Sequence, residues 1–446
     1  MTNVFHRHCH ADLPTAVGGD GPYIFDRKGK VYLDGSSGAA VSCLGHSNKE
    51  VQEAVTTQIH TMPFAHTGFF TNEPMEKLAE FLVQQAGGTQ SNVYFFSGGS
   101  EAVEGALKLA VQYFQEIGKP NKTKIIARKQ SYHGNTIGAL SAGGNAWRRT
   151  QFEGILVEMS HIDPCYAYRY QKEGETPEAY GKRAAGYLED EIIKQGAENV
   201  AAFIMEPVVG ATLGAVPAEV GYLQEIRRIC TKYDVLLILD EVMCGMGRTG
   251  HLFAHHEDNV EPDIVTIAKG LGAGYQPIGA TLVSKTIYDT IYHGTGFFQH
   301  GHTYIGHATA CAAALKVQEI IQRDNLLDNV QKLGVYLKEK LHHILADHPH
   351  VGDIRGRGLF VGVECVADKA TKSTFDSALK IHANIKKTAM QNGLMCYPMG
   401  GTIDGKNGDH VLFAPPFICT EQHMDELVAK FQQTLDEVLQ QEALAA

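Results

Sequence analysis

Polar residues directly follow four apolar runs of the sequence, at positions where they could do chemistry. These residues are Ser97-Gly98-Gly99-Ser100 after 93–96, Glu206 after 201–205, Asp240 after 235–239 and Lys269 after 264–268. In an open parallel sheet, ligands bind beyond the carboxyl ends of the strands. We therefore expect these four places to contribute to one site.

The glycine pair before the segment 101–115 has the composition of an anion site. Glycine lets the backbone approach a ligand closely, and free amides at the start of a helix present positive potential to an anion. Gly99 and Ser100 are the expected contacts. A serine and glycine cluster before a helix can equally be an ordinary N-cap, so this feature alone leaves both interpretations open.

Asp240 and Lys269 each follow a buried run, where an ionised side chain is costly to desolvate without a partner. Pyridoxal phosphate would use both residues. A carboxylate stabilises its protonated pyridine nitrogen, and a lysine amine forms a Schiff base with its aldehyde. A plain salt bridge between Asp240 and Lys269 is the structural alternative.

The elements that must position these residues follow from the hydrophobic pattern. Short apolar runs alternate with amphipathic segments from about residue 91 to 284, which predicts a parallel sheet covered by helices. The predicted strands are 93–96, 124–127, 201–205, 235–239 and 264–268, and 101–115 is a predicted helix. Residues 23–25 and 31–33 resemble paired strands. We expect them to pack with a C-terminal part that is helical over 308–344 and forms strands near 359–364 and 411–413.

Composition disfavours several other classes of function. The chain has 446 residues and a net charge of −11 with both signs interspersed, which argues against nucleic acid or an anionic membrane as a partner. No apolar run reaches the roughly 20 residues of a membrane span, and the start does not resemble a secretory signal. Nine scattered cysteines without a C-x-x-C pair fit a reducing compartment. We expect a cytoplasmic protein without a metal site.

Several strings resemble the class III aminotransferases, of the aspartate aminotransferase fold group. They are FFSGGSEAVEGALKLA, SYHG, MEPVVGA, LILDEVMCGMGRTG, TIAKGLGAGYQPIGA and HGHTYIGHATACAAAL, in the family's order. The resemblance implies an α/β protein of fold type I for pyridoxal-phosphate enzymes. Its large domain, 61–310, would hold a mostly parallel seven-stranded sheet covered by helices. Residues 1–60 and 311–446 would form a smaller α+β domain from both chain ends.

The resemblance also implies roles for residues around the cofactor ring. Lys269 would form the Schiff base and later move the proton between substrate and cofactor. Asp240 would bind the pyridine nitrogen, while Val242 and Tyr132 would pack on the two ring faces. The remaining contacts near the ring would be His133 and Glu206.

The phosphate would be held from two subunits. Gly99 and Ser100 would bind it from one chain, and Thr303 would reach it from the partner chain. The active site would then require a homodimer, which could pair further into a tetramer.

Departures from the family pattern bear on the substrate. The ornithine and γ-aminobutyrate branches carry an arginine and a glutamate where this chain has Leu412 and Ala211. The ω-amino acid and amine:pyruvate branch keeps a mobile arginine near the position of Tyr397. A tryptophan common in that branch corresponds to the stretch with Ala39 and Ala40, which suggests a roomier pocket. Arg148, Arg149 and Lys406 are the candidates for binding a substrate carboxylate.

The leading hypothesis is a transaminase that moves an amino group from an ω-amino acid, amine or diamino acid to a 2-oxo acid such as pyruvate. An isomerase or decarboxylase of the same fold would share Lys269 and Asp240, because the cofactor supports several outcomes. A non-catalytic relative is the third hypothesis. The combination of Lys269, Asp240 and the anion cradle argues against it, since a scaffold needs none of them.

Overall fold

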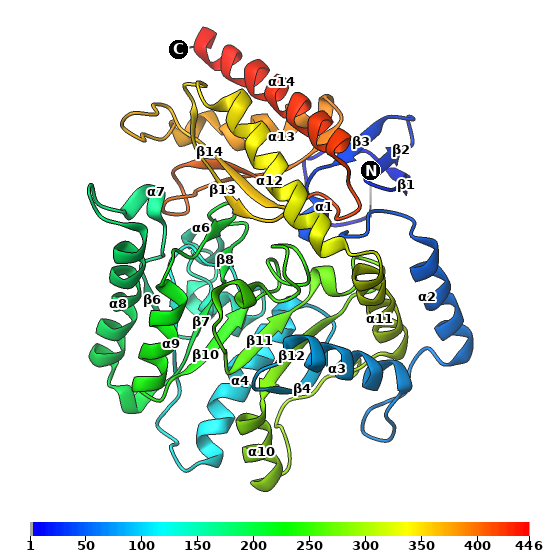
Figure 1. Cartoon of the computed structure of the whole chain (residues 1–446), viewed down its shortest axis with the longest axis vertical. Coiled ribbons are helices and arrows are strands. Elements are labelled where there is room, and N and C mark those ends of the chain that lie inside the picture. The colour runs from blue at the N-terminus through cyan, green and yellow to red at the C-terminus, as the bar shows by residue number, and fades with distance from the viewer. Residues whose placement is uncertain (1–2, 446) are drawn as a thin grey trace.

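The computed structural model describes residues 3–445. Figure 1 shows a large sheet flanked by helices in the lower part of the view and a smaller part above it, where the blue N-terminal strands lie beside the red C-terminal helix. None of the helices in the described range is long and apolar enough to cross a bilayer.

The large sheet has seven strands, and its order differs from the chain order. It runs β4 (Gln90–Phe96), β12 (Gly279–Ser284), β11 (Ile264–Ile267), β10 (Leu236–Asp240), β7 (Val200–Met205), β5 (Lys124–Arg128) and β6 (Ser160–Ile162). Only β12 runs antiparallel to its neighbours in this sheet. The predicted mostly parallel α/β sheet is confirmed, and the carboxyl ends of β4, β5, β7, β10 and β11 meet at one edge.

Helices cover both faces of the sheet because its central strands are apolar on both sides. Along β7, Ala202 and Ile204 belong to one core cluster, whereas Phe203 and Met205 belong to another. Buried parallel strands require such continuous apolar runs. The helices of the first cluster are α4 (Gly99–Glu116), α5 (Ile137–Ala142) and α10 (Lys285–His293), and those of the second are α8 (Pro177–Gln195) and α9 (Tyr222–Lys232).

The smaller part combines both ends of the chain. Its antiparallel sheet has the order β13 (Val351–Arg357), β14 (Phe360–Cys365), β17 (Asp409–Phe413) and β16 (Tyr397–Gly400), covered by α12 (Leu326–Leu345), α13 (Ile381–Gln391) and α14 (Glu421–Ala445). A second sheet joins β1 (Ala16–Asp20), β2 (Tyr23–Asp26) and β3 (Val31–Asp34) to β15 (Leu394–Met395), which pairs parallel with β3. The expected packing of the N-terminal strands with the C-terminal part is confirmed.

The predicted long helix over 308–344 is two helices, which corrects the sequence prediction. The first is α11 (Ala308–Arg323), and α12 begins after Asn325, whose φ of 51° ends the regular backbone. The helix α11 packs against α2 (Lys49–Thr61) and α3 (Glu73–Ala86) and so borders the large sheet. The division of the chain near residues 60 and 310 stays a prediction. The remaining α-helices and strands are short: α1 (Ser37–Ala40), α6 (Ala146–Arg149), α7 (Ala167–Tyr170), β8 (Val208–Val209) and β9 (Val216–Pro217). Five 3-10 helices also occur: η1 (Glu153–Ile155), η2 (Ala197–Asn199), η3 (Ala254–Asp258), η4 (Lys269–Leu271) and η5 (Ser377–Leu379).

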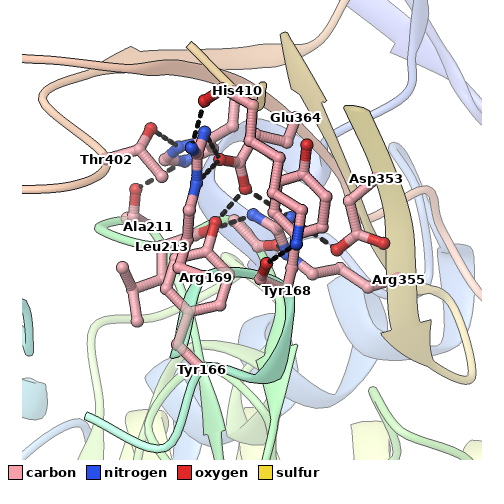
Figure 2. A network of polar contacts seen from close by, with 12 residues as sticks. Tyr166, Tyr168, Arg169, Ala211, Leu213, Asp353, Arg355, Glu364, Thr402 and His410 are labelled. Carbon is pink, nitrogen blue, oxygen red and sulfur yellow. Dashed lines mark hydrogen bonds and ion pairs between the residues drawn. The ribbon is translucent and has the colours of Figure 1, made fainter. Parts of the chain in front are cut away.

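A buried polar network fastens the smaller part to the large sheet (Figure 2). Glu364 in β14 accepts hydrogen bonds from Tyr166 and from Arg169 beside the large sheet, with 2.9 Å between Arg169 Nε and its carboxylate. It also pairs with Arg355 of β13 at 2.7 Å. Arg355 in turn donates to the carbonyls of Leu213 and Gly214 in the turn after β8. The network therefore fixes that turn relative to both parts of the molecule.

Candidate active site

A cavity of about 560 Å³ lies at the edge where the parallel strands end. Residues from both parts of the molecule line it, because Ala39, Val41 and Tyr397 close it from the smaller part. The sequence-predicted residues that share its lining are Gly99, Ser100, Tyr132, His133, Glu206, Asp240, Val242, Lys269 and Tyr397. Most of these cavity residues were therefore predicted from the rule that ligands bind beyond the carboxyl ends of parallel strands.

Asp240 ends β10 and is 3% exposed. One carboxylate oxygen, Oδ2, lies 2.7 Å from Nδ1 of His133, which is itself buried. The other oxygen, Oδ1, accepts hydrogen bonds from the backbone N–H of Val242 and the hydroxyl of Thr266 on β11. These contacts fix the carboxylate at the floor of the cavity.

Lys269 lies one residue beyond the end of β11, after Ala268, and adopts a left-handed backbone conformation with φ 48°. Burial lowers the pKa of its amine to about 8, although the carboxylates of Asp240 and Glu206 act in the opposite direction. Positive charge on Arg148 and Arg248 lowers this pKa further. The amine can therefore lose its proton near neutral pH, which a nucleophile or general base requires.

Glu206 follows β7, and its carboxyl group is almost fully buried. Burial raises its pKa to about 6, against the lowering effect of His133 and Arg128. Its Oε1 accepts the backbone N–H of Gly210 at 3.2 Å, while Oε2 is buried without a partner in the described chain. A buried oxygen of this kind is available to a ligand in the cavity.

The helix α4 begins at the cavity with Gly99, after the extended residue Gly98. A Cβ built on Gly99 would lie 2.6 Å from Cγ1 of Val242, so only glycine fits there without displacing that side chain. The hydroxyl of Ser100 accepts the backbone N–H of Asn135 at 3.1 Å and keeps its own proton for another acceptor. The free amides of this helix start present positive potential to the cavity.

Tyr132 and His133 come from the segment after β5, the strand next to β7. Tyr132 lines the cavity, and the guanidinium carbon of Arg148 lies 4.4 Å from the centre of its ring. Nε2 of His133 is buried without a hydrogen-bond partner within residues 3–445.

Three predicted residues lie elsewhere. Ala40 has a φ of 61° and packs with Leu412 in an apolar cluster behind the cavity, so these two expected pocket residues do not line it. The left-handed turn at Gly38 presents Ala39 to the cavity instead. Thr303 is exposed and does not line the cavity of its own chain. Its expected role toward a partner chain stays a prediction.

Some lining residues were not predicted from the sequence. Gln276, Pro277 and Ile278 belong to the string after Lys269 that carries the family resemblance, so the signal was present. Arg7 also lines the cavity, although it lies near the chain end, where nothing in the local pattern indicates a site.

The residues present fit the cofactor that the sequence predicts. The cavity holds an amine with a lowered pKa, a buried carboxylate and a helix start that suits a phosphate group. The unpartnered buried atoms of His133 and Glu206 are further positions at which a polar ligand can bond.

Comparisons with known proteins agree with this chemistry. The model of the aminotransferase class-III family matches residues 7–435. An uncharacterized aminotransferase of Schizosaccharomyces pombe is 46% identical over 423 residues, which cover 95% of this chain and 92% of that protein. A diaminobutyrate–2-oxoglutarate transaminase of Halomonas elongata is 38% identical over 96% of this chain and 92% of its own length.

Solved structures of similar proteins extend the match to the whole fold. The ω-transaminase of Pseudomonas jessenii in complex with PMP has a TM-score of 0.91 at 33% identity, covering 98% of this chain and 97% of that one. An (S)-enantioselective ω-transaminase of Thermomicrobium roseum has the same TM-score at 36% identity, covering 97% and 94%.

Proposed function

Because the chain belongs to the class III aminotransferase family, we propose that it is a pyridoxal-phosphate-dependent transaminase of ω-amino acids, amines or diamino acids, with a 2-oxo acid such as pyruvate as acceptor. The donor range is supported by the diaminobutyrate transaminase among its relatives and by the ω-transaminases among the similar structures. The single observation that carries the proposal is the shared cavity of Lys269, Asp240, Glu206 and the start of α4.

We assign the reacting amine to Lys269. Pyridoxal phosphate, when bound, supplies an aldehyde that condenses with amines and a protonated ring that withdraws electrons. Lys269 would hold the aldehyde and carry a proton to and from the substrate carbon, which its pKa of about 8 permits near neutral pH. Asp240 would accept the N–H of the ring, and His133 keeps that carboxylate in place through its 2.7 Å contact.

The remaining contacts follow from the shape of the cavity. The start of α4, with Gly99 and Ser100, would hold the phosphate through backbone amides and a hydroxyl. Val242 and Tyr132 would confine the ring from opposite faces. Glu206 would bond a polar ring substituent through its unpartnered Oε2.

We also propose a homodimer in which Thr303 completes the partner's phosphate site. Support comes from exposed apolar side chains on two segments near α3 and α11. Phe69 and Phe70 are 82% and 67% exposed, and Phe297 and Tyr304 are more than half exposed on the segment that carries Thr303. Large exposed apolar groups of this kind are typical of protein interfaces.

The compartment remains a proposal as well. The nine cysteines are free thiols, and all but Cys9 are buried or half-buried. This arrangement fits the reducing cytoplasm that the sequence predicts.

A donor panel tests the proposed activity. The purified protein is loaded with pyridoxal phosphate, and its visible absorbance is followed as amines, ω-amino acids and 2,4-diaminobutyrate are added. We expect a shift to the aminated cofactor, reversed by pyruvate or 2-oxoglutarate. Loss of carbon dioxide or rearrangement of the donor, without accumulation of the aminated cofactor, would contradict transamination.

A further inference from the structure

Two guanidinium groups line the cavity, those of Arg7 and Arg148, and of these only Arg148 has a buried nitrogen without a hydrogen-bond acceptor in the described chain. Arg148 lines the cavity beside Lys269 and also a wider cavity of about 920 Å³ next to it. Among the side chains that the structure describes, those of residues 3–439, no acidic group pairs with Arg148, and its Nε is buried without a hydrogen-bond acceptor. A buried donor of this kind costs free energy unless a ligand satisfies it.

The neighbouring residue, Arg149, has a structural role. Arg149 donates through Nη1 to the carbonyls of Leu140, Ser141 and Gly143, between 2.5 and 3.2 Å. It therefore holds α6 against α5. Arg148 lies on the same short helix, but its guanidinium makes no comparable hydrogen bond in the described chain. It therefore lines the cavity and does not hold helices together.

The position of Arg148 is fixed before any ligand arrives. The side chain of Asn145 caps α6 by accepting the backbone N–H of Arg148 at 3.3 Å. The guanidinium stacks on Tyr132, with its carbon 4.4 Å from the ring centre, and lies 5.8 Å from the ring of Trp147. A stacked guanidinium keeps the donors at its edge free, which suits a carboxylate.

The other positions where the resemblance would place a carboxylate-binding arginine carry none. Tyr397 lines the cavity at one of them, and Leu412 is buried in the apolar cluster at the other. The loop that follows β16 packs on α6 instead, since a Cβ on Gly405 would lie 2.8 Å from the backbone nitrogen of Trp147. That loop therefore supports Arg148 rather than supplying an arginine of its own.

We propose that Arg148 binds the carboxylate of the 2-oxo acid acceptor and determines the preference of this enzyme for carboxylate-bearing substrates. This inference rests on the proposed function, because it assigns one of its substrates to a residue. A guanidinium and a carboxylate can form two parallel charge-assisted hydrogen bonds. Asp240 and Glu206 would repel a carboxylate from the floor of the cavity and direct it toward the guanidinium groups, of which Arg148 is half-buried on α6 whereas Arg7 is exposed near the chain end.

The test separates the two half-reactions of the Arg148→Met variant by single-turnover absorbance. We expect the KM for pyruvate to rise about 30-fold or more, as for loss of a charge-assisted bidentate pair. The loss with pyruvate should exceed the loss with benzylamine, which has no carboxylate, by about ten-fold or more. Arg148→Lys should recover part of the affinity, because it keeps the charge without the planar fork.

Lys406→Met is the matched control. It removes a positive charge from the wider cavity that Arg148 borders, but Lys406 does not line the cavity of Lys269. We expect its KM for pyruvate to stay close to that of the unsubstituted protein. An equal rise in both variants would show a general charge effect and overturn the assignment.

Two further measurements keep the inference separate from the proposed function. Calorimetric binding of propionate, an inert carboxylate, to the cofactor-loaded protein should weaken about ten-fold in Arg148→Met, whether or not the protein turns over any donor. Retention of pyridoxal phosphate should stay unchanged. Loss of the cofactor with unchanged propionate affinity would show that Arg148 binds the phosphate instead, and unchanged values of both would also overturn the proposal.

Discussion

Lys269 combines a left-handed backbone, with φ 48°, and a buried amine at the end of a strand. A left-handed backbone costs free energy for a residue other than glycine, and burial of an amine costs free energy of desolvation. Such costs are typical of functional sites. Its position is set by the end of β11. This strand pairs with β10 in parallel register, with Thr266 opposite Asp240. The side chain itself adds little to the packing of the core.

We therefore expect Lys269→Ala to abolish activity without unfolding the protein. Turnover should fall at least about 10³-fold, because covalent and proton-transfer chemistry is lost together. The midpoint of thermal unfolding of the cofactor-free protein should stay within a few degrees. Near-normal multiple turnover in this variant would show that Lys269 is not the reacting amine.

The pKa of Lys269 gives a pH dependence. The amine reacts only when neutral, and its pKa in the cofactor-free protein is about 8, below the ordinary value of 10.5. The rate at which Lys269 captures added pyridoxal phosphate should rise about ten-fold per pH unit below pH 8 and level off above it. Stopped-flow absorbance measures this rate.

The Arg148→Met variant tests the origin of this pH dependence. Because the charge of Arg148 lowers the pKa of Lys269, its removal should move the plateau to higher pH. Lys406→Met should leave the plateau where it is. A plateau near pH 10 in the unsubstituted protein would contradict the burial of the amine.

Sequence reasoning at the level of single residues succeeded where a strand end defined the position. Asp240 ends β10, while Glu206 and Lys269 come just after β7 and β11, and the three residues meet at one edge for that reason. Ala40 illustrates the opposite case. Its neighbour Ala39 lines the cavity because three residues of this turn, Ser37, Gly38 and Ala40, have a left-handed φ. Nothing in an alanine pair indicates which alanine faces the cavity.

At the level of elements, the turn after β8 connects the site with the smaller part of the molecule. Ala211, in this turn, lines the cavity, and its carbonyl oxygen lies 2.9 Å from Nε2 of His410 in β17. Burial lowers the pKa of His410 to about 3, so the ring stays neutral across the physiological range. The network of Figure 2 thus holds this part of the cavity wall from behind.

Glu364 is the residue on which that network depends. Its carboxyl group is fully buried and contacts the guanidinium groups of both Arg169 and Arg355. Burial raises the pKa of Glu364 to about 8, but the two guanidinium groups in direct contact favour its charged form. We expect Glu364→Gln to destabilise the protein by about 3 kcal/mol, because it leaves two guanidinium groups with little compensating charge. Thermal unfolding of the cofactor-free protein measures the effect.

Asp353→Asn is the comparison for this change. Asp353 also pairs with Arg355, at 2.9 Å, but its side chain is partly exposed and Glu364 remains in place. We expect a loss below about 1 kcal/mol there. Similar unfolding midpoints for both variants would contradict a special role for Glu364.

Such a network could not be predicted from the sequence. Its hydrogen-bonded members lie far apart in the sequence, 198 residues for Tyr166 and Glu364 and 199 for Ala211 and His410. Most of the elements were predictable, because the hydrophobic pattern marks five of the seven strands of the large sheet, whereas β6 and β12 were not predicted from it. The break between α11 and α12 was missed, since apolar residues continue at helical spacing on both sides of Asn325.

At the scale of the whole molecule, two exposed segments favour contact between one chain and another. Phe69, Phe70, Phe297 and Tyr304 are each more than half exposed. Thr303 lies among them rather than in the cavity of its own chain. A two-fold dimer brings the same surface of each subunit against the other, so both exposed segments could reach the partner's site.

Subunit mixing tests this arrangement directly. A Lys269→Ala chain and a Thr303→Ala chain are coexpressed with different tags, and the mixed dimer is purified through both. If Thr303 serves the partner's site, one site of the mixed dimer contains an intact Lys269 and an intact Thr303, and about half of the normal activity should return at limiting pyridoxal phosphate. Pairing a doubly substituted chain with an unsubstituted one should restore no intact site. The reverse pattern would mean that Thr303 acts within its own chain, and a monomer in sedimentation would remove the shared site altogether.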